Sequence, residues 1–129
     1  MKKLLLILTL LFSVMFSSLA YAEWTKTAVT VEGVEFYVDF ERIREHDGYV
    51  YYWRLSNYLK PNSWGSLSAK IYIQGDCRLF RLKYLSSSFY KGPMGTGELN
   101  GSSNEPDKEW TYPTPNSSFE SILKKICSQ

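Results

Sequence analysis

The sequence predicts an α+β protein that is mainly β: a curved antiparallel sheet of about five to six strands, with a C-terminal helix packed on one face and tethered by a disulfide. Three observations lead to this prediction. Apolar and polar residues alternate in short runs between residues 24 and 85, apolar residues recur at helical spacing near the C-terminus, and the chain has two cysteines. A chain of 129 residues suits one small domain, which buries a modest fraction of its surface and gains from a covalent link.

Residues 1–22 have the pattern of a secretory signal peptide. Two lysines precede an apolar stretch at residues 4–16, and Ala-Tyr-Ala at residues 20–22 forms a small-x-small cleavage site. The apolar run breaks at Ser17, short of the roughly 20 residues that a membrane-spanning helix needs. We therefore expect an exported protein whose single domain comprises residues 23–129, with no stable membrane insertion after the signal is removed.

The expected location is the bacterial periplasm, or the cell surface or medium if the protein travels further. A bacterial lipoprotein carries a cysteine at its cleavage point, whereas the first cysteine here is Cys77. We therefore expect no lipoprotein anchor.

The formal net charge of +2 belongs to the signal peptide. Removal of residues 1–22 takes away two lysines and no acid, which leaves 13 basic and 13 acidic side chains in 107 residues. A neutral domain has no electrostatic footprint for nucleic acid or for an anionic membrane. We therefore expect a protein partner and no nucleic acid.

The two cysteines predict one disulfide, Cys77 to Cys127, because the periplasm is oxidising and only one pairing exists. A thiol nucleophile and a metal pair are the alternatives. Both are weak, since no Cys-x-x-Cys is present and the only histidine is His46. We expect no metal and no cofactor.

The mature chain begins with a predicted β-hairpin. Residues 24–31 and 34–40 are β-rich runs, and Gly33 between them can adopt positive φ. Alternation in the second run places Tyr37 on the more polar face.

A turn region follows the hairpin. Asp39 is placed to cap a short helical turn that carries Phe40 and Ile43, and Asp47 then begins a reversal of the chain. His46 lies just before this reversal, where we interpret it as an exposed loop histidine without catalytic partners.

The run GYVYYWRLSNY at residues 48–58 alternates as a strand does. We expect one set of its side chains to face the core under the helix: Tyr49, Tyr51, Trp53 and Leu55. The other set is expected on the opposite face of the sheet: Val50, Tyr52, Arg54 and Ser56.

Two further strands are predicted at residues 66–74 and 77–85, with a turn at residues 75–76 between them. Alternation places Tyr72 and Arg81 on the face away from the helix. The next segment, residues 86–115, is rich in Ser, Gly, Pro and Asn, and we expect a functional loop or an irregular stretch there.

The C-terminal helix has the clearest signals. Ser117 stands three residues before Glu120, which is a capping box, and apolar residues then recur at helical spacing up to Cys127. The predicted helix spans residues 117–127, so the disulfide ties the helix to the sheet.

The face away from the helix is the candidate binding surface, because tyrosine and arginine are enriched at protein interfaces. The candidate residues are Tyr37, Tyr52, Arg54, Tyr72 and Arg81. An ordinary solvated face, stabilised by cross-strand contacts, is the alternative. Edge strands and a Tyr-rich face also suit a homodimer.

No catalytic motif emerges from the sequence, and we expect no enzyme activity. A nucleophile elbow, a P-loop and a zinc-protease motif are all missing, and the glycines of GPMGTG suit a turn. Four carboxylates are the weak remaining candidates for acid-base chemistry: Glu35, Asp39, Glu41 and Glu45.

The order of motifs resembles the bacterial surface-adhesin protein E family over residues 24–127. The resembling segments are FYVDFERI, GYVYYWRLSNY, SLSAKIYIQGDCRLFRLKYL, YKGPMGTGEL and EWTYPTPNSSFESILKKIC. The most specific pieces are Tyr37-Val38-Asp39 before Ile43, Asp76-Cys77-Arg78, Met94-Gly95-Thr96-Gly97, and Trp110 before a Pro-rich turn into the helix.

The resemblance implies a non-enzymatic binding role, namely adhesion to a host matrix or serum protein. It also implies a small antiparallel β domain with a disulfide-tethered C-terminal helix. A second hypothesis is a periplasmic inhibitor or envelope accessory factor that acts by inserting the loop at residues 86–104.

Overall fold

The computed structural model describes residues 22–129, which form an antiparallel sheet of seven strands and a C-terminal helix, α2 (Ser118–Cys127). The sheet order is β1-β2-β4-β5-β6-β7, and β3 pairs with β4 outside this path. The strands are β1 (Thr25–Val29), β2 (Glu35–Val38), β3 (Arg44–His46), β4 (Tyr49–Asn57), β5 (Ser68–Asp76), β6 (Arg81–Tyr90) and β7 (Leu99–Ser103). Of the predicted signal peptide, residues 1–21 lie outside the described part of the chain.

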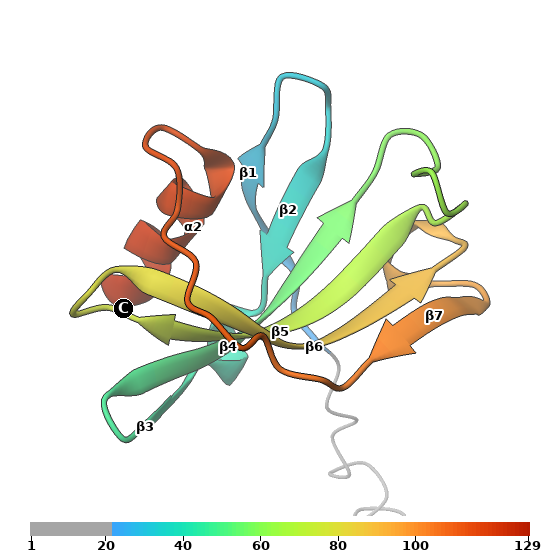
Figure 1. Ribbon diagram of the computed structural model, residues 1–129. Helices are drawn as coiled ribbons and strands as arrows, with labels where there is room; N and C mark the ends of the chain where they lie inside the picture. Colours follow the sequence, from blue (N-terminus) through green and yellow to red (C-terminus); the bar gives the residue numbers. More distant parts are fainter. Residues whose placement is uncertain (1–21) are drawn as a thin grey trace, which may run out of the picture.

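The helix lies on one side of the sheet, as predicted (Figure 1). Ile122, Leu123 and Ile126 on its inner face are at most 2 % exposed and contact the sheet core. The sheet contributes the other buried apolar side chains of this core cluster: Phe36, Val38, Val50, Tyr52, Ala69, Ile71, Ile73 and Leu82. Burial of these side chains is the main favourable contribution to folding.

β4 presents its two faces in the opposite sense from the prediction. Tyr52 and Arg54, expected on the partner-facing side, are 1 % and 3 % exposed and belong to the core under α2. Tyr49, Tyr51 and Trp53, expected in the core, are only partly buried and lie on the face turned away from the helix.

The physical reason is that Arg54 is accommodated in the core by aromatic rings. Its guanidinium lies 5.3 Å from the centroid of Phe36 and 5.1 Å from that of Tyr84. Arg54 Nη2 also donates a hydrogen bond to Tyr84 Oη at 2.9 Å. Cation–π contact and this bond offset part of the cost of burying the charge. Alternation only divides the strand into two faces. The face with Arg54 was predicted to be exposed because arginine is rarely buried.

β2 and β3 both pair with β4, one after the other along the same edge. Glu35–Val38 pairs with the second half of β4, and Arg44–His46 pairs with its first half. The 3₁₀ turn η1 (Phe40–Arg42) separates them. The sequence predicted this turn but missed β3, and Asp39 makes no side-chain capping bond to the turn.

The connection from β5 to β6 begins later than predicted. β5 continues through Gly75 and Asp76, and the turn comprises residues 77–80. Asp76 Oδ1 accepts hydrogen bonds from the backbone N–H groups of Arg78 and Leu79, at 3.1 Å and 3.2 Å. The carboxylate thereby stabilises a turn that occupies the start of the expected strand.

Residues 86–104 form a β-hairpin and not the irregular loop that composition predicted. β6 continues to Tyr90, and the chain returns as β7 through the 3₁₀ turn η2 (Pro93–Gly95). The Met94 and Gly95 amides donate to the side chains of Asn57 and Ser68, both at 2.8 Å. This hairpin tip is therefore held against β4 and β5.

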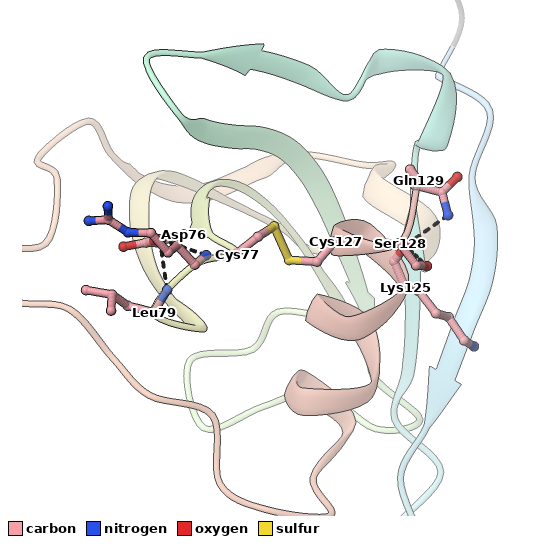
Figure 2. Close-up of a disulfide and its surroundings, with 8 residues drawn as sticks. Asp76, Cys77, Leu79, Lys125, Cys127, Ser128 and Gln129 are labelled. Carbon is pink, nitrogen blue, oxygen red and sulfur yellow. Dashed lines mark hydrogen bonds between the residues drawn. A yellow bond between two sulfur atoms is a disulfide. The ribbon is translucent and has the colours of Figure 1, made fainter.

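The end of α2 is joined to the β5–β6 turn by the predicted disulfide, Cys77–Cys127 (Figure 2). The Cα atoms of the two cysteines are 5.6 Å apart. At the other end of the helix, Ser117 Oγ accepts a hydrogen bond from the Glu120 amide at 3.2 Å, which confirms the predicted cap.

Candidate functional site on the open face

The open face is the face of the sheet that turns away from α2. Directly opposed residues in an antiparallel pair share a face, so the register assigns its members. Five aromatic side chains gather there and are partly buried; we call them the aromatic platform. The platform consists of Tyr49, Tyr51 and Trp53 from β4, Tyr72 from β5, and Trp110.

The centre of the platform is the pair of contacts that Tyr72 makes across the β4–β5 ladder. Its ring centroid lies 4.7 Å from that of Trp53 and 6.2 Å from that of Tyr51. Gln74 donates a hydrogen bond to Tyr51 Oη at 3.2 Å. Aromatic contacts at these separations hold the rings in defined orientations, so the surface is pre-organised.

Trp110 extends the platform from a segment far away in the sequence. Residues 104–117 run from β7 back to α2 and are drawn in orange to red in Figure 1. Thr111 and Leu82 exchange two backbone hydrogen bonds of 2.9 Å, which hold this segment beside β6. The Trp110 ring then stacks on Tyr49 with centroids 5.5 Å apart.

Two cations lie against the same indole. Arg81 Cζ is 4.3 Å from the centroid of Trp110, and Lys83 Nζ is 4.8 Å from it. Each contact is a cation–π interaction, which stabilises the ring and keeps positive charge at the surface. The open face therefore combines aromatic area with positive charge.

Asp76 orients Arg81. Arg81 Nε donates to Asp76 Oδ2 at 2.9 Å, and the aspartate is 4 % exposed. Burial on its own would raise the pKa of Asp76, but the hydrogen bond from Arg81 and those from the Leu79 and Arg78 amides outweigh it and hold the pKa below its ordinary value. Asp76 therefore remains ionised and fixes the guanidinium beneath Trp110.

A hollow of about 380 Å³ adjoins the platform. It is lined by Tyr51 and Tyr72 together with Arg44, Glu45 and His46 of β3. β3 supplies the charged side chains of its rim.

The structure separates the five predicted binding residues into two groups. Tyr72 and Arg81 belong to or adjoin the platform, and Tyr37 lies further along the open face, where its hydroxyl donates to Glu35 at 3.2 Å. Tyr52 and Arg54 are core residues, and burial raises the pKa of Tyr52.

Sequence reasoning missed the residues that make up most of the platform. The sequence predicts Tyr49, Tyr51 and Trp53 in the core, and it predicts no contacts for Trp110, which lies in the segment expected to be a functional loop or an irregular stretch. The cross-strand register would have identified the first three, because Trp53 lies opposite Tyr72, which was correctly placed. Nothing local to Trp110 indicates its partners, which come from β4 and β6.

Within residues 22–129, no three or more His, Cys, Asp or Glu side chains are grouped to hold a metal ion. None of the helices in this range is both long and apolar enough to cross a membrane.

The fold and the open face define a small disulfide-linked β domain with an aromatic and cationic surface, as protein-binding modules have. The family model described as "Surface-adhesin protein E" matches residues 24–128, so the chain belongs to the surface-adhesin protein E family. Membership supports a surface adhesin, an exported class of binding protein.

Solved structures of Haemophilus influenzae protein E have the same fold. Crystal form II is 19 % identical, with a TM-score of 0.59, over 86 % of this chain and 94 % of that chain. The selenomethionine form is 18 % identical, with a TM-score of 0.61, over 87 % of this chain and 90 % of that chain. A search of curated proteins found no significant match.

Proposed function

We propose that this chain is an exported, non-enzymatic adhesin that binds a host protein through the aromatic platform. One observation carries the proposal: five aromatic rings and two stacked cations are collected on the face of the sheet that the helix leaves uncovered. Trp, Tyr and Arg are the residue types that most often dominate binding energy at protein interfaces.

The aromatic platform offers rigidity as well as contact area. The rings are already held by one another and by Gln74 and Arg81, so little side-chain entropy is lost when a partner covers them. Large amphipathic rings on a strand scaffold can remain partly wet in the free protein and become dry on binding. The platform therefore has the properties of a preformed contact surface.

The charges on the open face favour an acidic partner surface. Arg44 lies directly opposite Tyr51, and Lys83 lies opposite Gln74, so both basic side chains adjoin the rings. Complementary charge accelerates encounter and fixes the orientation of the complex. We infer that the partner is a host matrix or serum protein that presents an acidic, partly apolar patch.

The experiment compares two matched pairs of variants. Tyr72→Ala and Trp110→Ala remove rings from the platform, whereas Trp64→Ala and Leu59→Ala remove apolar side chains that are 82 % and 70 % exposed on the β4–β5 loop. Binding to a panel of immobilised matrix and serum proteins is measured by surface plasmon resonance. We expect the platform variants to weaken binding at least tenfold, and the loop variants to bind as the parent does.

Two outcomes contradict the proposal. Unchanged binding by Tyr72→Ala and Trp110→Ala excludes the platform, and loss of binding in the loop variants alone assigns the contact to the hairpin tips. Light scattering on the same samples separates partner binding from self-association, because a homodimer through this face would dissociate in the platform variants. Protease treatment of intact cells then tests whether the platform is displayed at the cell surface.

A further inference from the structure

A second hollow lies on the open face beside the platform, at the break between β2 and β3. Its volume is about 320 Å³, which falls within the range of small-molecule sites. Three aromatic rings contribute to its walls: Trp24, Trp53 and Tyr90. The hollow shares Trp53 with the platform and otherwise draws on different residues.

Asp39 is the feature that distinguishes this hollow from an ordinary surface depression. The residue is 1 % exposed and lines the hollow. Arg42 Nε lies 3.4 Å from Asp39 Oδ2, an ion pair that is long for a hydrogen bond. Among residues 22–129, no donor hydrogen-bonds either carboxylate oxygen. A buried acceptor without a donor is costly, so a ligand that donates to it recovers free energy.

Positive charge accompanies the buried carboxylate. Arg42 and Lys70 line the same hollow. Lys70 Nζ lies 5.2 Å from the Tyr90 ring centroid and makes no ion pair with a carboxylate in the described residues. The hollow therefore offers one buried anionic acceptor and two cationic donors between aromatic walls.

The chemistry of these groups selects the ligand. A simple cation meets repulsion from the arginine and the lysine, and a simple anion that approaches the Asp39 carboxylate meets repulsion from it. A hydroxyl group can donate to a carboxylate and accept from an ammonium or guanidinium group. Apolar ligand surface can then pack on the aromatic walls. A neutral ring that carries several hydroxyls meets all three requirements.

We propose that the hollow at Asp39 is a saccharide-binding subsite. It holds one neutral pyranose unit, whose hydroxyls bond Asp39 and Lys70 and whose C–H face packs on the aromatic walls. The subsite goes beyond the proposed protein binding by the platform and does not depend on it.

The test uses the indole N–H signals of the four tryptophans in a ¹⁵N-labelled, exported chain. Glucose, galactose and N-acetylglucosamine are titrated separately, with acetate, methylammonium and glycine as charged controls. We expect saturable shifts of Trp24 and Trp53 with at least one sugar and a millimolar dissociation constant. Trp64 and Trp110 lie outside the hollow and are expected to remain unshifted.

Variants complete the test. Asp39→Leu removes the buried acceptor and Tyr90→Leu removes one aromatic wall, and each is expected to weaken sugar binding at least tenfold. Trp64→Leu is the matched control and is expected to bind normally. If Asp39→Leu fails to fold, as seen in its amide spectrum, Tyr90→Leu decides the matter alone.

Three results overturn the proposal. The first is the absence of any saturable shift of Trp24 and Trp53 with all three sugars. The second is an equal response to glycine or to either simple ion, which would indicate a charged or zwitterionic ligand. The third is sugar binding that survives in folded Asp39→Leu and Tyr90→Leu.

Discussion

The guanidinium of Arg54 lies 4.5 Å from the ring centroid of Phe119, so a charged group from the sheet packs directly against the first turn of α2. Phe36 and Tyr84 contact the same guanidinium, and Arg54 Nε has no hydrogen-bond partner among the described residues. The first turn of α2 therefore packs against a buried guanidinium that three aromatic rings contact.

Removal of the Arg54 side chain should strongly destabilise the fold. Arg54→Ala leaves a cavity among three rings and an unpaired Tyr84 hydroxyl, and we expect a loss of about 3 kcal/mol in the free energy of unfolding. Arg54→Met fills most of the space without a buried charge and should recover most of this loss. Urea denaturation measures both variants. Arg44→Ala, at an exposed position on β3, is the control and should change stability by less than about 0.5 kcal/mol. Equal losses of unfolding free energy in Arg54→Met and Arg54→Ala would show that filling the space does not restore stability, which contradicts this prediction.

Loss of the disulfide should lower stability through the unfolded chain. The bond closes a loop with a sequence separation of 50, for which loop-closure entropy predicts about 4 kcal/mol. The Cys77→Ser, Cys127→Ser double variant should unfold at a correspondingly lower urea concentration. Dithiothreitol should reduce the stability of the parent and leave the double variant unaffected. A parent whose stability does not respond to full reduction would refute this prediction.

Gly75 should not tolerate a larger side chain, because α2 lies close above it. A Cβ atom at this position would stand 2.9 Å from Val50 Cγ2 and 3.2 Å from Leu123 Cδ1. Gly75→Ala therefore forces the helix and β4 apart, and we expect a loss of about 1–3 kcal/mol. Thermal unfolding followed by circular dichroism provides the measurement. Ser102→Ala on the exposed strand β7 is a control, and its melting temperature should match that of the parent. A Gly75→Ala variant as stable as this control would contradict the close packing of α2 and β4 around Gly75.

Asp76 should make stability depend on pH in the acidic range. Its pKa is lower in the folded protein than the ordinary value of 3.8, so its contribution is complete well above that value and is lost as the pH falls through the folded pKa. Asp76→Asn should therefore cost about 1–2 kcal/mol at neutral pH. The difference from the parent should vanish in strong acid. Urea denaturation at a series of pH values tests the prediction, with the exposed Glu105→Gln as control. A difference that persists unchanged in strong acid would exclude the charge as its cause.

Local patterns were sufficient for much of the fold. The alternation of apolar and polar residues predicted the hairpin of β1 and β2 and the central strands β4 and β5. Ser117 and Glu120 located the helix start because a cap depends on residues three positions apart. The two cysteines defined the only available pairing, and the structure confirms it.

Composition gave wrong predictions for strands whose conformation depends on pairing with other parts of the chain. Residues 86–104 look irregular because they contain many Ser and Gly residues, yet they pair as β6 and β7. β3 is only three residues long, and its strand conformation depends on β4 as a partner. Short or exposed strand segments carry little hydrophobic pattern, so β3, β7 and the second half of β6 were not predicted.

The amino-acid sequence alone was enough to predict a small, mainly β domain with a capped C-terminal helix and one disulfide. Those features follow from local periodicity, capping and the cysteine count, which need no knowledge of spatial neighbours. Which face of β4 packs under the helix depends on the tertiary structure. Arg54 is buried because Tyr84 and Phe119, 30 and 65 positions away along the chain, surround it. Once Arg54 lies inside, the period of two in a strand turns Tyr51 and Trp53 outward to Tyr72, and Trp110 completes the open face.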